Sequence, residues 1–160
     1  MNAQSNPVAS LLPPFTTETA ILKIRAVEDT WNAPVPEGLA RGYSPDCLWR
    51  NRSEFLHGCP GVIAFLTRKW TAELDYRLIE DLWAFDGNRI AARFTYESHD
   101  ASSQWHRAHG IEIWQFDGVV LSRFRHASIN DLAFGKEVRP FLWPLGRRPG
   151  PHPGLTQIGA

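Results

Sequence analysis

Apolar residues recur at helical spacing in two stretches of the first half of the chain. The first stretch predicts a helix from Thr16 or Thr17, either of which can cap it, to about Trp31. Its apolar face carries Ala20, Ile21, Ile24, Val27 and Trp31. The second stretch predicts a helix from Gly58 to about Glu73, with a buried stripe of Val62, Ile63, Leu66 and Trp70. A short helix from about Pro36 to Tyr43 is expected between them.

From Leu74 onward the apolar period changes to two, which is the period of a strand. This pattern predicts four long strands at 75–85, 89–99, 104–116 and 119–130, after a shorter strand at 47–55. Asp86-Gly87-Asn88 and Asp117-Gly118 are hairpin signals, because these residues tolerate positive φ. Four successive long strands therefore form a meander.

A meander of this kind has one apolar face, which the upstream helices can cover. We predict one α+β domain at 16–134, a curved antiparallel sheet covered by three N-terminal helices that enclose a small-molecule pocket. Residues 1–15 are expected to be a flexible N-terminal segment. Residues 135–160 are expected to be a Pro/Gly/Arg-rich C-terminal arm, and the apolar residues at 141–143 favour an arm packed on the body or on a partner.

The charge balance argues against several partners. Lys plus Arg and Asp plus Glu number 17 each, and no long basic run suggests a nucleic-acid or anionic-membrane surface. No apolar stretch could span a bilayer, and residues 1–14 lack the features of a secretion signal. Cys47 and Cys59 form no CxxC motif and suit a reducing compartment, so we expect a cytoplasmic protein. We also expect a homodimer through the outer, convex side of the sheet, which the near-zero net charge permits.

The order of the elements and several local segments together resemble a known family. The segments include Leu48-Trp49-Arg50-Asn51-Arg52, 65–70, 73–78, Ala127-Ser128-Ile129-Asn130-Asp131 and 146–155. They resemble an uncharacterised SnoaL-like family of the nuclear-transport-factor-2-like superfamily, whose members are cone-shaped α+β domains and often dimers. The resemblance implies the fold. It implies no reaction, because that family is one of unknown function.

One stretch departs from the family text. Where the family has a Gly-Asn-Glu-Asn-Trp-like stretch, this chain reads Gly110-Ile111-Glu112-Ile113-Trp114. Two polar side chains are thus replaced by apolar ones. If those positions point into the pocket, a substrate of the family carries over poorly to this chain.

The predicted hairpins distribute the polar residues between two faces of the sheet. Closing the loops as above places Glu97 opposite Arg107, Arg93 opposite Ile111, Arg107 opposite Ser128 and His109 opposite His126. We expect this polar face to be the inward one. The second face carries Ile90, Ala92, Phe94, Tyr96, Glu112, Trp114, Arg123 and Arg125. Glu112 opposite Arg123 is interpreted there as a structural pair.

The resemblance supports this choice of face. In limonene epoxide hydrolase, a member of the same superfamily, an Asp-Arg-Asp arrangement and a Tyr–Asn pair hold the attacking water. Trp49 and Asn51 would match the Tyr–Asn pair, and Arg93 would match the Arg. The two Asp positions fall at Thr95 and Ser128, so that mechanism is not expected here.

The candidate site residues follow from these two arguments. The expected catalytic residues are Glu97, His109 and His126, and the expected ligand-binding residues are Trp49, Asn51, Arg93, Arg107, Ser128 and Asn130. A carboxylate can act as a general base, an imidazole titrates near neutral pH, and an arginine can hold an anion. The alternatives are a cross-strand ion pair at the rim for Glu97 with Arg107, and structural histidines. We expect no metal and no cofactor, since the His spacing and the absence of nucleotide-binding motifs give no support for them.

Two functions fit this pattern. One is a cofactor-free acid/base enzyme, of isomerase, lyase or hydrolase type, acting on a small partly apolar molecule. The other is a non-catalytic protein that binds such a molecule in the same pocket. A buried carboxylate or imidazole with a shifted pKa that a ligand can reach would favour the enzyme, and fully paired polar groups would favour the binder.

Overall fold

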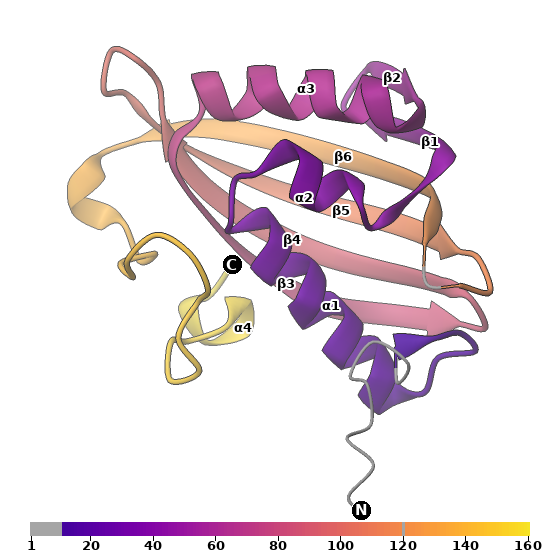
Figure 1. The fold of residues 1–160 in the computed structure, drawn as a ribbon. Helices are drawn as coiled ribbons and strands as arrows, with labels where there is room; N and C mark the ends of the chain where they lie inside the picture. Colours follow the sequence, from indigo (N-terminus) through magenta and orange to yellow (C-terminus); the bar gives the residue numbers. More distant parts are fainter. Residues whose placement is uncertain (1–10, 120) are drawn as a thin grey trace, which may run out of the picture.

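Helices cover one face of a sheet in the computed structural model (Figure 1). It describes residues 11–119 and 121–160, so residues 1–10, most of the expected flexible N-terminal segment, and Val120 lie outside the described residues. Helices α1 (Thr17–Trp31), α2 (Pro36–Ala40) and α3 (Gly58–Ala72) confirm the predicted helices. Thr16 caps α1, because its hydroxyl accepts a hydrogen bond from the backbone N–H of Thr19 at 3.2 Å. No helix within the described ranges is long and apolar enough to cross a membrane.

Within the described ranges the sheet has six strands in the order β2-β1-β6-β5-β4-β3. The strands are β1 (Tyr43–Asn51), β2 (Glu54–His57), β3 (Leu74–Asp86), β4 (Arg89–His99), β5 (Trp105–Phe116) and β6 (Ser122–Phe134). β1 pairs with β6 in parallel and the other neighbours are antiparallel. The strand expected at 47–55 is therefore wrong: the chain turns at Arg52, whose φ is 57°, and β2 folds back on β1. The predicted α+β class with a curved, helix-covered sheet is confirmed (Figure 1).

The two predicted hairpin registers differ in outcome. In the β4–β5 pair, Glu97 lies opposite Arg107 and Arg93 opposite Ile111, as predicted. In the β5–β6 pair, Arg107 lies opposite Leu132 and His109 opposite Asn130, four residues from the predicted register. The error arises because β6 begins at Ser122 and the pairing shifts between Gln115 and Phe116. Since the shift is even, every side chain stays on its predicted face of the sheet, although its cross-strand partner changes.

The assignment of the inward face is wrong. Ile90, Ala92, Phe94, Tyr96 and Trp114 are buried beneath the helices, so the second face is the inner one. The outer end of the Phe94 ring lies over Gly110 of the next strand, where a Cβ would stand 2.1 Å from Cζ of the ring. Only glycine therefore allows this ring to cover β5. Large aromatic rings need this burial more than the polar side chains of the other face do, since each fully buried large apolar side chain contributes about 1.5–3 kcal/mol.

Helix α1 also seals the edge strand β3. The Asn32 side chain donates to the Leu78 carbonyl at 2.9 Å and accepts from the Leu78 N–H at 2.8 Å. Glu28, which is fully buried, accepts from the Glu80 N–H at 2.9 Å. These contacts satisfy backbone groups that an edge strand leaves unpaired, and so fix the position of β3 at Glu80.

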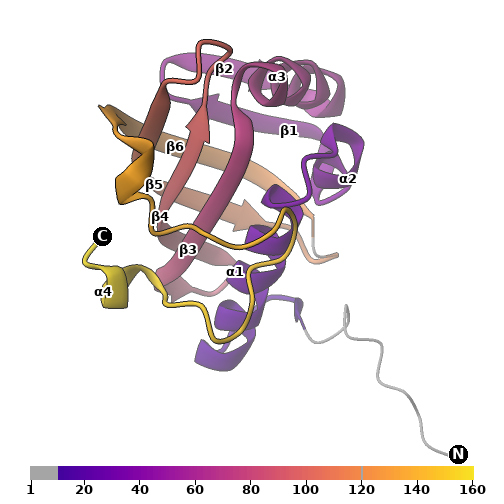
Figure 2. The same cartoon turned by 90° about the vertical axis from the view of Figure 1, so that its left-hand side faces the viewer.

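The C-terminal segment lies across the outer face of β3 and β4 (Figure 2). It contains a 3₁₀ turn η2 (Lys136–Val138) and helix α4 (Leu155–Ile158). Phe141, Trp143 and Leu155 form a second buried apolar cluster with Ile79 of β3. Arg77 donates to the Trp143 carbonyl at 3.0 Å, and Arg148 donates to Glu28 at 2.8 Å. The segment is thus packed on the body of its own chain.

Candidate functional site

Four polar side chains lie together in the apolar interior of the inner face. Asn51 of β1, Glu112 of β5 and Arg125 of β6 are buried there, and Glu80 of β3 lies beside Glu112. Ala127 separates Asn51 from Glu112 in the strand register, and Ala92 is the neighbour of Glu112 on β4. These two small residues leave space around the Glu112 carboxylate. We call Asn51, Glu80, Glu112 and Arg125 the inner polar cluster.

Arg125 is the centre of this cluster. Its Nε donates to Glu112 Oε2 at 2.5 Å and its Nη1 donates to Asn51 Oδ1 at 3.2 Å. Its guanidinium also lies 4.5 Å from the ring centroid of Trp49 and 5.0 Å from that of Trp31. The charge is therefore held by an ion pair, an amide and two cation–π contacts, which is the pairing that burial of a guanidinium requires.

Glu80 has a different environment. It is 3% exposed, and no N–H or O–H group of the described residues donates to its carboxyl oxygens. Burial raises the pKa of Glu80 well above its usual value, Glu112 raises it further, and Arg125 opposes the shift. Two neighbouring carboxyl groups can form a hydrogen bond only when one carries a proton. The raised pKa therefore favours the protonated form of Glu80 beside the Glu112 carboxylate.

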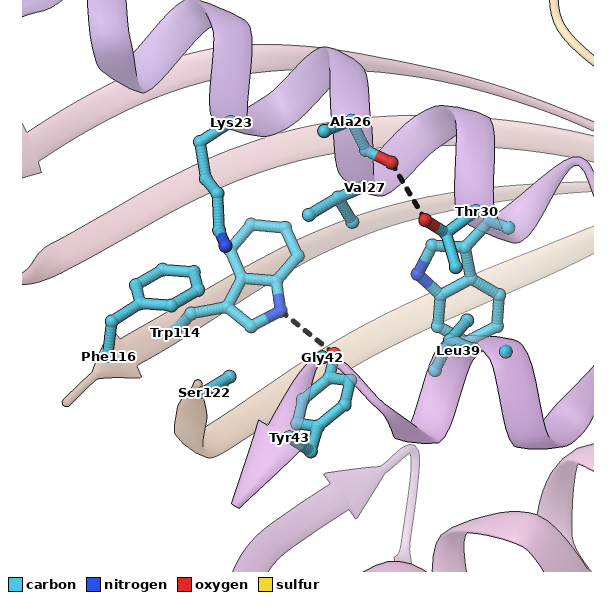
Figure 3. Close-up of a pocket in the computed structure, with 12 residues that line it drawn as sticks. Lys23, Ala26, Val27, Thr30, Leu39, Gly42, Tyr43, Trp114, Phe116 and Ser122 are labelled. Atoms are coloured by element: carbon cyan, nitrogen blue, oxygen red, sulfur yellow. Dashed lines mark hydrogen bonds between the residues drawn. The ribbon is translucent and has the colours of Figure 1, made fainter. Parts of the chain in front are cut away.

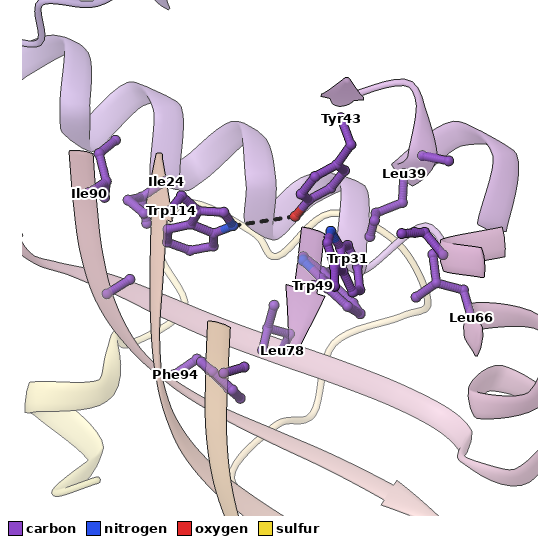
Figure 4. Close-up of a cluster of buried hydrophobic side chains, with 14 of the residues drawn as sticks. Ile24, Trp31, Leu39, Tyr43, Trp49, Leu66, Leu78, Ile90, Phe94 and Trp114 are labelled. Atoms are coloured by element: carbon purple, nitrogen blue, oxygen red, sulfur yellow. Dashed lines mark hydrogen bonds between the residues drawn. The ribbon is translucent and has the colours of Figure 1, made fainter. Parts of the chain in front are cut away.

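Aromatic side chains form the walls around the cluster. Figure 4 shows Trp31, Trp49 and Tyr43 gathered over the sheet, and the Tyr43 and Trp49 ring centroids are 4.8 Å apart. Burial raises the pKa of Tyr43 and of Tyr76, so both phenols stay protonated. The indole N–H groups of Trp31, Trp49 and Trp70 are buried and find no acceptor among the described residues. The interior thus holds several donors that face no protein acceptor.

Two neighbouring spaces lie beside the cluster. The inner chamber, which Asn51, Glu112 and Arg125 line together with Trp31 and Lys69, has a volume of about 10 Å³. That is space for roughly one water-sized atom. A vestibule of about 270 Å³ lies between α3 and the β1–β2 turn, and Asn51 and Lys69 line both spaces.

A polar ring closes the rim between these spaces. Lys69 Nζ donates to Glu73 at 2.5 Å and to the Tyr96 hydroxyl at 3.1 Å. Arg52 reaches the same hydroxyl at 3.3 Å and pairs with Asp131 at 2.6 Å. The rim charges are therefore matched, and side-chain movement of Lys69 would open the chamber to the vestibule.

A third cavity of about 120 Å³ lies between α1, α2 and the ends of β5 and β6 (Figure 3). Lys23 points into it beside Phe116, whose ring centroid is 4.7 Å from Nζ. Burial lowers the pKa of Lys23 to about 8, and Asp117 opposes the shift. Trp114 Nε1 donates to the Tyr43 hydroxyl at 3.3 Å in the same wall. Trp31 separates this cavity from the inner chamber, because it lines both.

The structure divides the predicted site residues between two faces. Trp49 and Asn51 lie at the inner polar cluster. The remaining seven lie on the outer face, which contradicts their placement in one cavity: Arg93, Glu97, Arg107, His109, His126, Ser128 and Asn130. The physical reason is strand alternation, because Arg93, Glu97 and His109 alternate with residues buried under the helices. The match of Arg93 to the same site as Trp49 and Asn51 is therefore wrong.

The outer-face residues have partners of their own. Arg93 donates to Thr156 at 2.7 Å and to the Ala160 carbonyl at 2.9 Å. His109 Nδ1 lies 2.9 Å from the Thr95 hydroxyl, and burial followed by Arg107 lowers its pKa. The pKa of His126 is lowered by burial and then by Arg50, which also donates to Ser128 at 3.1 Å. Asn130 is exposed.

Glu97 fastens the C-terminal segment. It is fully buried and accepts from Arg107 at 2.8 Å and from Arg139 at 3.1 Å, while the Arg139 guanidinium lies 3.8 Å from the Trp105 ring centroid. The cross-strand ion pair of Glu97 with Arg107, the structural alternative to a catalytic role, is thus present, and the C-terminal segment supplies a second arginine.

We expect Glu97→Gln to lower the free energy of unfolding by about 2–3 kcal/mol, because it leaves two part-buried guanidiniums with a weaker acceptor. Amide exchange in residues 136–158 should rise, since Arg139 is one of their anchors. Urea unfolding and hydrogen exchange measure both effects. Glu54→Gln breaks the exposed pair with Arg68 and is the matched control, with an expected change below about 0.5 kcal/mol. Unchanged exchange in the segment would contradict the fastening role.

Sequence reasoning assigned no site role to Glu80, Glu112 and Arg125. Glu112 pairs with Arg125, whereas Arg123 lies 3.8 Å from Asp46 at the surface. A signal was available, because Glu80 interrupts the alternating buried set Tyr76 and Leu78 of β3. An isolated carboxylate in an apolar stripe either pairs in the core or serves a site.

The metal-ligating side chains and the thiols of the described residues form no second site of this kind. Among the described residues, no group of three His, Cys, Asp or Glu side chains could hold a metal ion. Cys47 and Cys59 are free thiols, and burial raises the pKa of Cys47 to about 11. Such a thiol is a poor nucleophile at neutral pH.

Solved structures similar to this one share its fold. SalBIII, an epoxide hydrolase/cyclase-like enzyme of pyran ring formation in the polyether salinomycin, is 9% identical with a TM-score of 0.65, covering 73% of this chain and 97% of its own. An NTF2-like protein of unknown function from Burkholderia pseudomallei K96243 is 18% identical with a TM-score of 0.62, at coverages of 69% and 90%. The BvnE pinacolase from Penicillium brevicompactum is 13% identical with a TM-score of 0.61, at coverages of 71% and 86%. At these identities the likeness shows the fold, and it confirms the predicted resemblance to the nuclear-transport-factor-2-like superfamily.

Sequence comparison gives the family. No curated protein matches the chain. The family model described as "Protein of unknown function (DUF1348)" matches residues 13–142, which include the inner polar cluster. Since this match spans most of the chain, the protein belongs to the DUF1348 family.

Proposed function

We propose that the protein is a cofactor-free acid/base enzyme, of isomerase, lyase or hydrolase type, that acts on a small partly apolar molecule at the inner polar cluster. The observation that carries this proposal is Glu80, a buried carboxyl that no described N–H or O–H group pairs and whose pKa is raised. Burying such a group is costly, and unexplained buried polar groups with raised pKa values are typical of catalytic acids.

The roles follow from the geometry of the cluster. Glu80 holds a proton that it can give to a substrate, and the Glu112 carboxylate beside it can take one, so the pair can move a proton between two positions. Arg125 is fixed by Glu112 and Asn51 and can stabilise negative charge that develops on the substrate. Catalysis of this type uses groups that the chain itself supplies.

Related folds support the class without naming the reaction. SalBIII is described as an epoxide hydrolase/cyclase-like enzyme, LinA as a hexachlorocyclohexane dehydrochlorinase and BvnE as a pinacolase. Other similar structures belong to proteins of unknown function. A fold that hosts several reactions raises the expectation of catalysis, and the site must decide it.

The test is solvent proton exchange. We would incubate the protein in D₂O with a library of neutral, anionic and cationic small molecules and detect deuterium incorporation or product by NMR. Glu80→Gln keeps the shape and removes the titrating proton, so the rate on any responding compound should fall about 100-fold or more. Asp81→Asn, on the adjacent residue facing the outer side, is the control and should retain the rate. An unchanged rate in Glu80→Gln would place the acid elsewhere.

The second candidate is a non-catalytic small-molecule-binding protein. It is favoured by the hydrogen bonds of Arg125 to Glu112 and Asn51 within an aromatic wall, because these contacts occupy the arginine without a ligand. Binding without exchange in the D₂O experiment, with equal affinity in the parent protein and Glu80→Gln, would support it over the enzyme.

We also propose a homodimer through the part of the outer face that the C-terminal segment leaves open. Large apolar side chains are exposed there, namely Leu48, Phe55, Ile111, Ile113 and Leu132. A groove of about 430 Å³ continues this surface beside Ile113 and Phe124. Exposed apolar surface of this extent is typical of an association site.

Ile111→Glu is expected to convert the dimer to a monomer, because Ile111 is 63% exposed and a carboxylate there would be buried on association. Sedimentation velocity at micromolar concentration measures the change. Trp83→Glu alters an equally apolar side chain, 74% exposed on the edge strand β3, and should leave the dimer intact. A parent protein that sediments as a monomer would overturn the proposal.

We further propose a cytoplasmic location, which the free thiols Cys47 and Cys59 support.

A further inference from the structure

The charges of the inner chamber already sum to zero. Among the residues that line the chamber, Arg125 is matched by Glu112 in a direct ion pair, and the buried Tyr76 is an uncharged phenol. At the rim, Lys69 is matched by Glu73. A charged ligand group in this chamber would therefore be buried without a counter-charge, which costs several kcal/mol for a single ion. The electrostatics select a neutral group.

The hydrogen-bonding groups of the chamber select an acceptor. The Trp31 indole lines the chamber, and its N–H is buried without an acceptor among the described residues. Trp49 and Trp70, with ring centroids 6.1 Å and 5.8 Å from Trp31, also carry unpaired indole N–H groups, but only Trp31 of the three lines the chamber. An indole N–H can only donate, so a ligand group that pairs with the Trp31 N–H must bring an oxygen or nitrogen lone pair.

The size of the chamber limits what enters. About 10 Å³ accommodates roughly one water-sized atom, whereas the vestibule on the other side of Asn51 and Lys69 has about 270 Å³. A terminal oxygen fits the chamber while the body of the molecule stays outside. Phe65 and Ala72 supply apolar surface for that body.

We infer that the ligand of this site is a neutral molecule with a terminal acceptor oxygen of carbonyl type on a small apolar body. The oxygen enters the inner chamber, where it accepts from the Trp31 indole, and the body occupies the vestibule. This inference rests on the proposed function in that it concerns the same chamber, but it is a statement about recognition and holds for an enzyme or a binder.

A matched series of six-membered rings tests the inference. Cyclohexanone, methylenecyclohexane, cyclohexanecarboxylate and cyclohexylammonium share one body and differ in the group that reaches the chamber. Titration calorimetry and protein-observed NMR shifts of the tryptophan indole N–H signals measure their binding. Cyclohexanone should bind saturably and perturb the Trp31 signal, and each of the other three should bind at least tenfold more weakly, as expected for a lost hydrogen bond or a buried charge.

Trp31→Phe removes the N–H and keeps an aromatic ring, so it should weaken cyclohexanone binding by roughly tenfold. Trp83→Phe makes the same change at an exposed position and should leave binding unchanged. If Trp31→Phe does not fold, the indole shifts of the parent protein still report whether the ketone reaches the chamber. Tighter binding of the carboxylate or the ammonium, or no saturable binding of cyclohexanone, would overturn the inference.

The outcomes for recognition and for catalysis are separable. Selective ketone binding with no proton exchange would keep the inference and reject the enzyme. Proton exchange on a charged compound, lost in Glu80→Gln, would keep the enzyme and reject the inference.

Discussion

Replacing Glu112 by glutamine is expected to lower the free energy of unfolding by about 3–5 kcal/mol, one of the largest effects of a single substitution in this protein. Arg125 and Glu112 are 3% and 2% exposed, and their 2.5 Å contact is the charge pairing of a guanidinium held between two indole rings. Glutamine keeps the shape but leaves the guanidinium without its counter-charge. Urea unfolding at neutral pH measures the loss.

A double substitution distinguishes the ion pair from simple packing. Glu112→Leu with Arg125→Met replaces the pair by apolar side chains of similar size, and buried pairs replaced in this way often lose little stability. The double variant should therefore be more stable than either single variant, with a coupling energy of about 2–3 kcal/mol. Arg123→Met removes an exposed charge two residues before Arg125 on the same strand. It should change the free energy of unfolding by less than about 0.5 kcal/mol. Additive effects of the two buried substitutions would show that the pair is not coupled.

The double variant also bears on function. If the inner polar cluster has only a structural role, the apolar double variant should fold and should still bind ligand like the parent protein. If it exists for a site, the double variant should fold and lose ligand binding. A buried ion pair is weak evidence for stability on its own, so this contrast separates the two reasons for keeping Arg125 in an aromatic core.

The fold was predictable because its patterns are local. Helical stripes at 20–31 and 62–70 and alternation after Leu74 each extend over enough residues to be unambiguous, and Asp-Gly pairs place the hairpins. The turn at Arg52 was missed because a non-glycine residue adopts positive φ there. An arginine in the sequence gives no signal for such a turn, unlike a glycine or an asparagine. The register of β6 was missed because the pairing shifts between Gln115 and Phe116. Such a shift does not change the alternation of apolar and polar residues along the strand.

The site was predicted on the wrong face for a related reason. Alternation sorts residues into two faces correctly, as Glu97 with Arg107 shows, but it does not say which face the helices cover. The polar face looked like a site because its charges faced no known partner. In the folded chain Arg139 reaches Glu97 and residues near the C-terminus reach Arg93, contacts that cross 42 and 67 positions of sequence. Partners so distant in sequence cannot be read from a strand pattern, whereas the apolar neighbours of Glu80 and Glu112 could have been.

The pH dependence of stability provides a direct test of the proton on Glu80. In the unfolded chain Glu80 titrates near pH 4.3, and in the folded chain burial and Glu112 raise its pKa. Below about pH 4 both states carry the proton, so Glu80 adds no pH dependence. Between the two pKa values the unfolded state releases the proton and the folded state keeps it. Stability therefore falls as pH rises, by about 1.4 kcal/mol per pH unit, and levels off above the folded pKa.

Glu80→Gln does not titrate, so the difference in unfolding free energy between this variant and the parent protein isolates the effect. That difference should grow by about 1.4 kcal/mol for each pH unit above roughly pH 5, in favour of the variant, until the folded pKa is passed. Urea unfolding at pH 5, 6, 7 and 8 measures it, and Glu54→Gln, at an exposed pair, should run parallel to the parent protein. Parallel curves for Glu80→Gln would mean that Glu80 is already ionised in the folded chain. It could then be a base but not the acid of the cluster, and Glu112 with Arg125 would have to be reconsidered as the groups that hold the proton.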